Sequence, residues 1–226
     1  AARTIGLAGG TGTSVTGAGV TNSGTIIAGG GPVTVNAGTG TLTNTAVTGL
    51  ISNNGSGNTI NLTGDKMALA GTITGGSGAV NIGNSTLSDA IILGAVGDTT
   101  AATLELSNAE LNTISTTGVL TVGAAAQTGA TTISAALTPT TTGGLTIINQ
   151  TGGIAVNQVV TLGTGDLTLN ADGGTGLAGA ITDNGSGKLV ATSGNLTLTA
   201  NGGIGALAAN PLHIGTVGGT LSATNS

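Results

Sequence analysis

The chain has 226 residues, of which 38% are apolar, 5% are charged and none is aromatic. Its net charge is −5, and its only Lys and Arg residues are Arg3, Lys66 and Lys188. This excludes an ordinary nucleic-acid binder, because phosphate binding needs clustered basic side chains. The absence of cysteine excludes disulfides and thiolate metal sites. Although 45 residues are glycine, the low charge and mean hydropathy of +0.42 are not those of a disordered chain.

Short segments with apolar side chains at alternate positions recur along the chain, a pattern typical of half-buried strands. In chain order they are residues 32–36, 59–62, 79–82, 103–106, 119–122, 145–148, 166–169, 195–198 and 219–222. Gly-rich segments separate them, threonine is abundant and good helix formers are scarce. The sequence therefore predicts an all-β fold, with a brief helical turn between Asp98 and Ile114 as its nearest approach to a helix.

Internal repeats indicate how these strands are arranged. Residues 166–176 nearly match residues 195–205, and residues 51–57 resemble residues 181–187. Such repeats are typical of solenoids, in which each copy is one coil. The unequal spacing between strands disfavours a short-period helix and favours a parallel β-helix with three strand faces per coil. We expect about ten coils in one continuous solenoid over residues 1–226.

Two structural questions stay open at this level. Antiparallel sandwiches and barrels remain compatible with the strand spacing, although Asn54-Gly55 and Asn184-Gly185 are few hairpin signals for so many strands. Asparagines follow strands at Asn36, Asn170 and Asn201. In a parallel stack they would form hydrogen-bonded ladders, or they would simply favour turns.

From Leu106 onward the chain resembles the β-strand repeats of filamentous-haemagglutinin-like large exoproteins of Gram-negative bacteria. The segments that carry the resemblance are residues 106–114, 118–123, 166–170, 202–205, 209–212 and 218–222. The resemblance implies a right-handed parallel β-helix that is exported to the cell surface and acts as an adhesin or matrix fibre. No amino-terminal secretion domain of that family is recognisable, so we expect a repeat region of a longer or processed protein.

Few side chains are candidates for chemistry. His213 is the single histidine, with no acid near it in sequence, and one histidine without cysteine does not make a typical zinc site. Paired carboxylates would serve a glycosidase. Asp166 and Asp172 flank one turn, but the second repeat copy has Asn195 and Asn201 there, which favours turn residues. The acids are Asp65, Asp89, Asp98, Glu105, Glu110, Asp166, Asp172 and Asp183.

Other ligand sites have little support. Calcium is conceivable at Asp65, Asp166, Asp172 or Asp183, but the acidic glycine repeat of calcium-binding β-rolls is missing. The glycine runs are followed by neither the Lys-Ser/Thr pair nor the helix that a phosphate loop needs. Thr-rich faces suggest ice-binding solenoids, yet the threonines do not recur on a fixed coil length.

The sequence therefore predicts a structural, non-enzymatic extracellular β-helix, with no catalytic, cofactor-binding or metal-binding residues and no cofactor. It would form an adhesin shaft or a subunit of a secreted or cell-surface fibre in a biofilm matrix. The expected partners are a second copy or further coils at the coil ends, and host-surface or matrix polysaccharide. The runner-up is a carbohydrate-binding or polysaccharide-processing β-helix. Residues 4–64 and 111–165 lack charge, but polar residues and glycine interrupt both, so no membrane span is expected.

Overall fold

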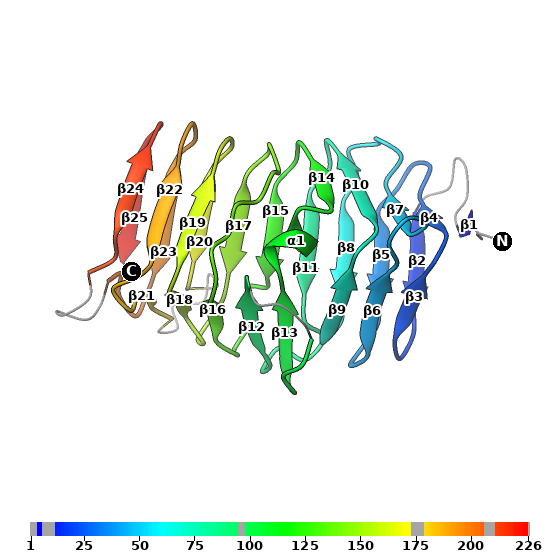
Figure 1. Ribbon diagram of the computed structural model, residues 1–226, viewed down its shortest axis with the longest axis horizontal. Helices are drawn as coiled ribbons and strands as arrows, with labels where there is room; N and C mark the ends of the chain where they lie inside the picture. The colour runs from blue at the N-terminus through cyan, green and yellow to red at the C-terminus, as the bar shows by residue number, and fades with distance from the viewer. Residues whose placement is uncertain (1–3, 6–11, 95–97, 173–178, 206–210, 226) are drawn as a thin grey trace.

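The computed structural model is an elongated stack of short strands with one short helix (Figure 1). It describes residues 4–5, 12–94, 98–172, 179–205 and 211–225. Arg3 and the glycine run at residues 173–176 lie outside this part of the chain. No helix in the described ranges is long and apolar enough to cross a membrane.

Nine strands form the longest sheet, which runs the length of the molecule and is called here the nine-stranded sheet. Their order in the sheet is their order in the chain, so each new coil adds one strand beside the last. The strands are β2 (Thr13–Thr16), β5 (Val33–Asn36), β8 (Ile60–Thr63), β11 (Val80–Gly83), β15 (Leu120–Gly123), β17 (Leu145–Ile148), β20 (Leu167–Asn170), β23 (Leu196–Ala200) and β25 (Leu221–Asn225).

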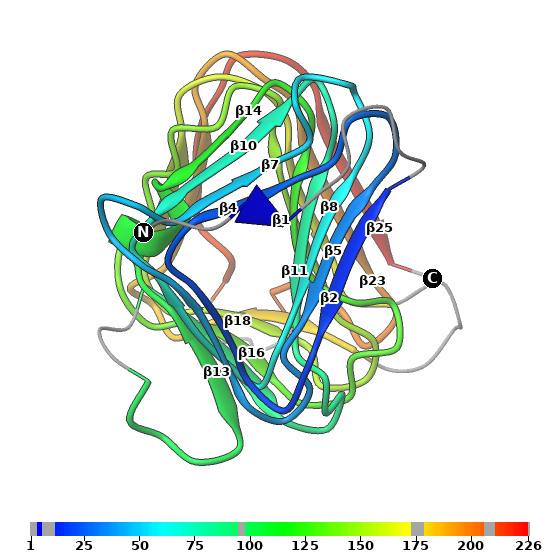
Figure 2. The same cartoon turned by 90° about the vertical axis from the view of Figure 1, so that its right-hand side faces the viewer.

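Four shorter sheets complete the coils, which enclose a single interior when seen end-on (Figure 2). Two belong mainly to the amino-terminal half: β1 (Thr4–Ile5), β4 (Thr25–Ile27), β7 (Leu50–Ser52), β10 (Thr72–Gly76) and β14 (Ile114–Thr116); and β3 (Val20–Asn22), β6 (Thr41–Asn44) and β9 (Lys66–Leu69). The others contain β13 (Thr103–Leu106), β12 (Ala90–Leu93), β16 (Thr131–Ile133), β18 (Ile154–Val156) and β21 (Ile181–Asp183); and β19 (Val159–Leu162), β22 (Lys188–Ala191) and β24 (Ile214–Val217).

Every pairing between these strands is parallel. This confirms the all-β solenoid and removes the antiparallel alternatives. The Asn54-Gly55 turn has the positive φ angles of a type I′ turn, 55° and 70°, yet it connects β7 to β8 in different sheets rather than forming a hairpin. The right hand and the count of ten coils stay predictions.

The interior is an aliphatic column in which each coil contributes the same positions. On the nine-stranded sheet, one inward position is filled from β5 to β23 by side chains with no exposed surface. These residues are Val33, Ile60, Val80, Leu120, Leu145, Leu167 and Leu196. Because every coil has the same narrow cross-section, branched aliphatic residues fill it without aromatic bulk.

The helical turn expected between Asp98 and Ile114 is α1 (Asn108–Leu111), which lies on the outside of the coils (Figure 1). Ser107 caps it in a complete capping box with Glu110, and Leu111 anchors it to the core. Strand β13 precedes it and adds to the sheet beside β12. Strand β13 and α1 thus interrupt the simple coil between β12 and β14.

Candidate functional site

The acids are the natural place to look for chemistry, and the structure shows most of them bonded to backbone N–H groups. Asp65 accepts hydrogen bonds from the Thr86 N–H at 2.7 Å and from its hydroxyl at 2.6 Å. Asp166 accepts the Asn195 N–H at 2.8 Å and the Asn195 side-chain amide at 3.0 Å. Asp166 and Asn195 are thus stacked equivalents in neighbouring coils, as expected of turn residues.

Glu105 and Glu110 stabilise the inserted segment around β13 and α1. The Glu105 carboxylate accepts the N–H groups of Thr99 and Thr100 and the Thr100 hydroxyl. Burial opposes ionisation of Glu105, but these hydrogen bonds outweigh it and lower its pKa. Glu110 accepts from Leu69 N–H at 3.1 Å and from Ser107 N–H at 2.8 Å.

Asp98 is the acid whose environment differs most from the others. Burial raises the pKa of its carboxyl, and the negative charge of Glu110 raises it further. A hydrogen bond with the Met67 backbone opposes this shift but does not cancel it. Its buried Oδ1 has no hydrogen-bond partner, while Lys66 Nζ donates to the Asp98 carbonyl at 2.7 Å. A raised carboxyl pKa is what a general acid requires. Among the described acids, Asp98 is therefore the one whose environment best fits that role.

His213 has an acidic partner that its sequence neighbours do not reveal. Its Nδ1 lies 2.8 Å from Oδ2 of Asp183, which is 30 residues earlier, and its backbone N–H donates to the same oxygen at 3.3 Å. Because an ionised carboxylate only accepts, Nδ1 carries the proton. The histidine side chain is 49% exposed and that of Asp183 is fully buried.

The other Asp183 oxygen, Oδ1, accepts the N–H groups of Gly185 and Gly187. Burial opposes its charge, but the bonds from His213 and from these glycines outweigh burial and lower the pKa of Asp183. The Asp183–His213 pair thus links two successive coils. In the described part of the chain, no group of three or more His, Asp or Glu side chains is placed to hold a metal ion.

Asp183 has a structural equivalent in Asn53, at the same position of the repeat 51–57. Asn53 Oδ1 accepts the Gly55 N–H at 3.0 Å, just as Asp183 accepts that of Gly185. The two residues differ in the hydrogen bond that they make with the next coil: the Asn53 amide donates to the Gly75 carbonyl. Asp183 cannot donate, and His213 donates to it instead. This position therefore serves to join coils in both copies.

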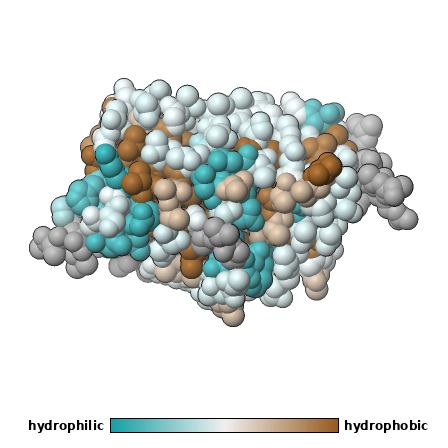
Figure 3. All heavy atoms as spheres, viewed as in Figure 1, coloured by the Kyte–Doolittle hydropathy of each residue, from teal (hydrophilic) through white to brown (hydrophobic). Residues whose placement is uncertain are grey.

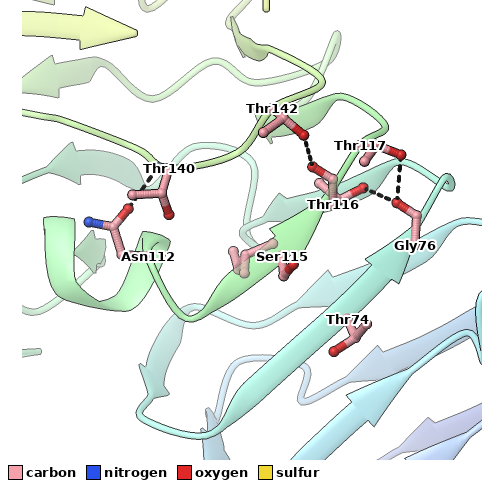
Figure 4. Close-up of a pocket in the computed structure, with 9 residues that line it drawn as sticks. Thr74, Gly76, Asn112, Ser115, Thr116, Thr117, Thr140 and Thr142 are labelled. Carbon is pink, nitrogen blue, oxygen red and sulfur yellow. Dashed lines mark hydrogen bonds between the residues drawn. The ribbon is translucent and has the colours of Figure 1, made fainter. Parts of the chain in front are cut away.

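A pocket of about 250 Å³ opens beside α1 and the edge of β14 (Figure 4). Thr140 N–H donates to Asn112 Oδ1 at 2.9 Å, and the Thr117 hydroxyl donates to the Gly76 carbonyl at 3.1 Å. None of its lining residues ionises, so it offers hydroxyl groups but no general acid or base. The lining residues are Thr74, Gly76, Asn112, Ile114, Ser115, Thr116, Thr117, Thr140 and Thr142.

The face of the molecule that carries α1 is mixed in hydropathy. Most of it is intermediate in hydropathy, with scattered hydrophilic and apolar patches (Figure 3). A second pocket of about 330 Å³ lies between α1 and β9, the strand whose Met67 backbone bonds to Asp98. It is lined by Ala68, Leu69, Ala70, Ala109, Glu110 and Thr113.

Comparison with known proteins yields no relative: no family model, no curated protein and no solved structure matches the chain. The resemblance to filamentous-haemagglutinin-like exoproteins accordingly remains a prediction that rests on the residues quoted for it.

Proposed function

We propose that the protein is a structural β-helix, the shaft of a secreted or surface-anchored adhesin or a subunit of a matrix fibre. The observation that carries the proposal is the unbroken aliphatic column behind the nine-stranded sheet, with hydrogen-bonded strands along its whole length. Such a stack resists bending and stretching because each coil is bonded to both neighbours. The extracellular location comes from the family resemblance alone.

The end of the stack is the proposed contact surface. β25 pairs with β23 on one side, all its residues are exposed, and Leu221 is 48% exposed at the end of the buried column. An open strand edge with apolar side chains behind it is a template for another strand. A second copy, or further coils of a longer chain, would continue both the hydrogen bonds and the column.

Sedimentation velocity and electron microscopy of the purified chain test this. We expect rods of constant width whose length grows with protein concentration, and we expect Leu221→Lys to keep them short. Val47→Lys is the matched control, because Val47 is fully exposed on a loop and the added charge is the same. Monomers at every concentration, or equal effects of both changes, would contradict end-to-end assembly.

The runner-up, a polysaccharide-processing β-helix, has Asp98 as its supporting observation. We expect no release of reducing ends from β-glucan, chitin or polygalacturonate, because the neighbouring Glu105 and Glu110 carboxylates are already bonded to backbone N–H groups. If cleavage is seen and Asp98→Asn abolishes it while Asp166→Asn does not, the structural proposal is wrong for this protein.

A further inference from the structure

The outer face of the nine-stranded sheet carries a row of small polar side chains, one from each coil. In each strand from β5 to β23 this position lies between two buried positions, so the side chain projects outward. The strand pairings place these residues directly beside one another. The row consists of Ser14, Thr34, Asn61, Asn81, Thr121, Thr146, Thr168, Thr197 and Ser222.

Unequal coil lengths do not disturb this row. Thr121, Thr146, Thr168 and Thr197 are separated by 25, 22 and 29 residues, yet each pairs with the next. The loops absorb the difference, and the register shifts between described strands fall in other sheets, at β10–β14 and β22–β24. The lack of a fixed spacing in the sequence is therefore no argument against an ordered threonine array.

The four threonines have the chemistry of a surface that orders water. Each is partly exposed, and none of their hydroxyls has a hydrogen-bond partner within the described residues, which leaves these hydroxyls available to water. Their branched side chains have few rotamers, which keeps methyl and hydroxyl groups in fixed places. Successive hydroxyls repeat at about 4.8 Å, the distance between strands. Further along, the Asn81 amide donates to Asn61 at 2.9 Å, so these two side chains bond to each other rather than to water.

Charge also limits what this face can bind. No strand of the nine-stranded sheet contains an ionisable residue, whereas Lys66, Asp98, Glu105 and Glu110 lie around other sheets and α1. Asp166, directly before β20, is exposed but is bonded to Asn195, so the row itself presents no charge to a ligand. A soluble sugar needs a concave site, and the hydroxyl-lined pocket of Figure 4 lies at β10 and β14, on another side of the coil from the nine-stranded sheet (Figure 2).

We propose that the outer face of the nine-stranded sheet binds ice through the row centred on Thr121, Thr146, Thr168 and Thr197. Ice is an uncharged, extended lattice of water oxygens, and a repeating row of rigid hydroxyl and methyl groups holds water in positions that such a lattice can incorporate. Ordered water on fixed hydroxyls costs little entropy when the water is already immobile in ice. This activity is independent of end-to-end assembly, since it uses the side of the rod.

The test measures the fraction of amino-terminally labelled protein that enters slowly growing ice, relative to labelled albumin. We expect wild-type protein to concentrate in the ice several-fold over albumin and to inhibit ice recrystallisation. The double change Thr146→Lys with Thr168→Lys should return incorporation to the albumin level. Thr132→Lys with Thr182→Lys is the matched control, because it adds the same charge at outward positions of another sheet, on β16 and β21.

A second pair of variants guards against misfolding. Thr146→Asn with Thr168→Asn places there the residue that the fold already carries at Asn61 and Asn81, and it should also lower incorporation at unchanged melting temperature. Exclusion of wild-type protein from ice would overturn the proposal. An equal loss in Thr132→Lys with Thr182→Lys, or full incorporation of the asparagine pair, would overturn the assignment to this row.

Discussion

Asn53→Asp is expected to lower the free energy of unfolding by about 3 kcal/mol or more at neutral pH, because it leaves a buried charge facing carbonyl oxygens. Asn53 has no exposed surface, and its amide donates to the carbonyls of Asn58 and Gly75. A carboxylate there loses both bonds and faces both oxygens. Urea unfolding followed by circular dichroism measures the loss.

The pH dependence of this variant distinguishes charge from packing. Burial and the two carbonyls raise the folded-state pKa of the new carboxyl above its unfolded value of about 3.9. The penalty is therefore small below the unfolded pKa and grows as pH rises through the folded pKa. A penalty that does not change with pH would indicate a packing defect and contradict the explanation.

Asp183→Asn is the reciprocal control, since Asp183 occupies the equivalent position with the opposite requirement. Its pKa is lowered by bonds from His213, Gly187 and Gly185, which outweigh the effect of burial. The native carboxylate thus contributes stability above its unfolded pKa, and that stability is lost as pH falls through the folded pKa. Asp183→Asn should cost about 1–3 kcal/mol at neutral pH and less in acid.

The fold was largely predictable because its strongest signals are local. Alternating aliphatic residues mark the strands, and the near-identity of residues 166–170 and 195–199 predicted that they occupy the same place in successive coils. The structure confirms this residue by residue, with Leu167 beside Leu196 and Leu169 beside Leu198. The expected helical turn is present as α1, where Ser107 and Glu110 form the capping box.

Contacts between coils were less predictable, because they depend on loop lengths that set which residues become neighbours. Asparagine ladders exist, but at Asn22–Asn44 and Asn61–Asn81. Asn36 and Asn170 instead accept N–H groups two residues ahead, which is turn chemistry. For Asn201 the two interpretations stay open.

The partner of His213 was missed for the same reason. One signal for it does exist in the sequence, because the repeat replaces Asn53 by Asp183 at a position that must join two coils. An acid there needs a donor from the next coil, and His213 follows at about one coil length. The aligned threonine row was missed because spacing was judged by chain length rather than by register.

Leu145→Ala is expected to cost about 2–5 kcal/mol, since it opens a cavity in the middle of the aliphatic column. Leu145 has no exposed surface and lies between Leu120 and Leu167 on the neighbouring coils. Because each coil contacts only its neighbours, the damage should be local, and hydrogen exchange should accelerate most in β15, β17 and β20.

Leu221→Ala provides the matched control, because Leu221 occupies the same position of the column on the last strand, β25. It is 48% exposed and has a coil on one side only, so the same change should cost about 1 kcal/mol or less in dilute solution. Under conditions that favour end-to-end stacking, Leu221→Ala should shorten the rods more than Leu145→Ala does. Equal unfolding costs for the two leucines in dilute protein would contradict a column buried by stacking alone. A large cost at Leu221 that appears only at high concentration would show that a second copy completes the column.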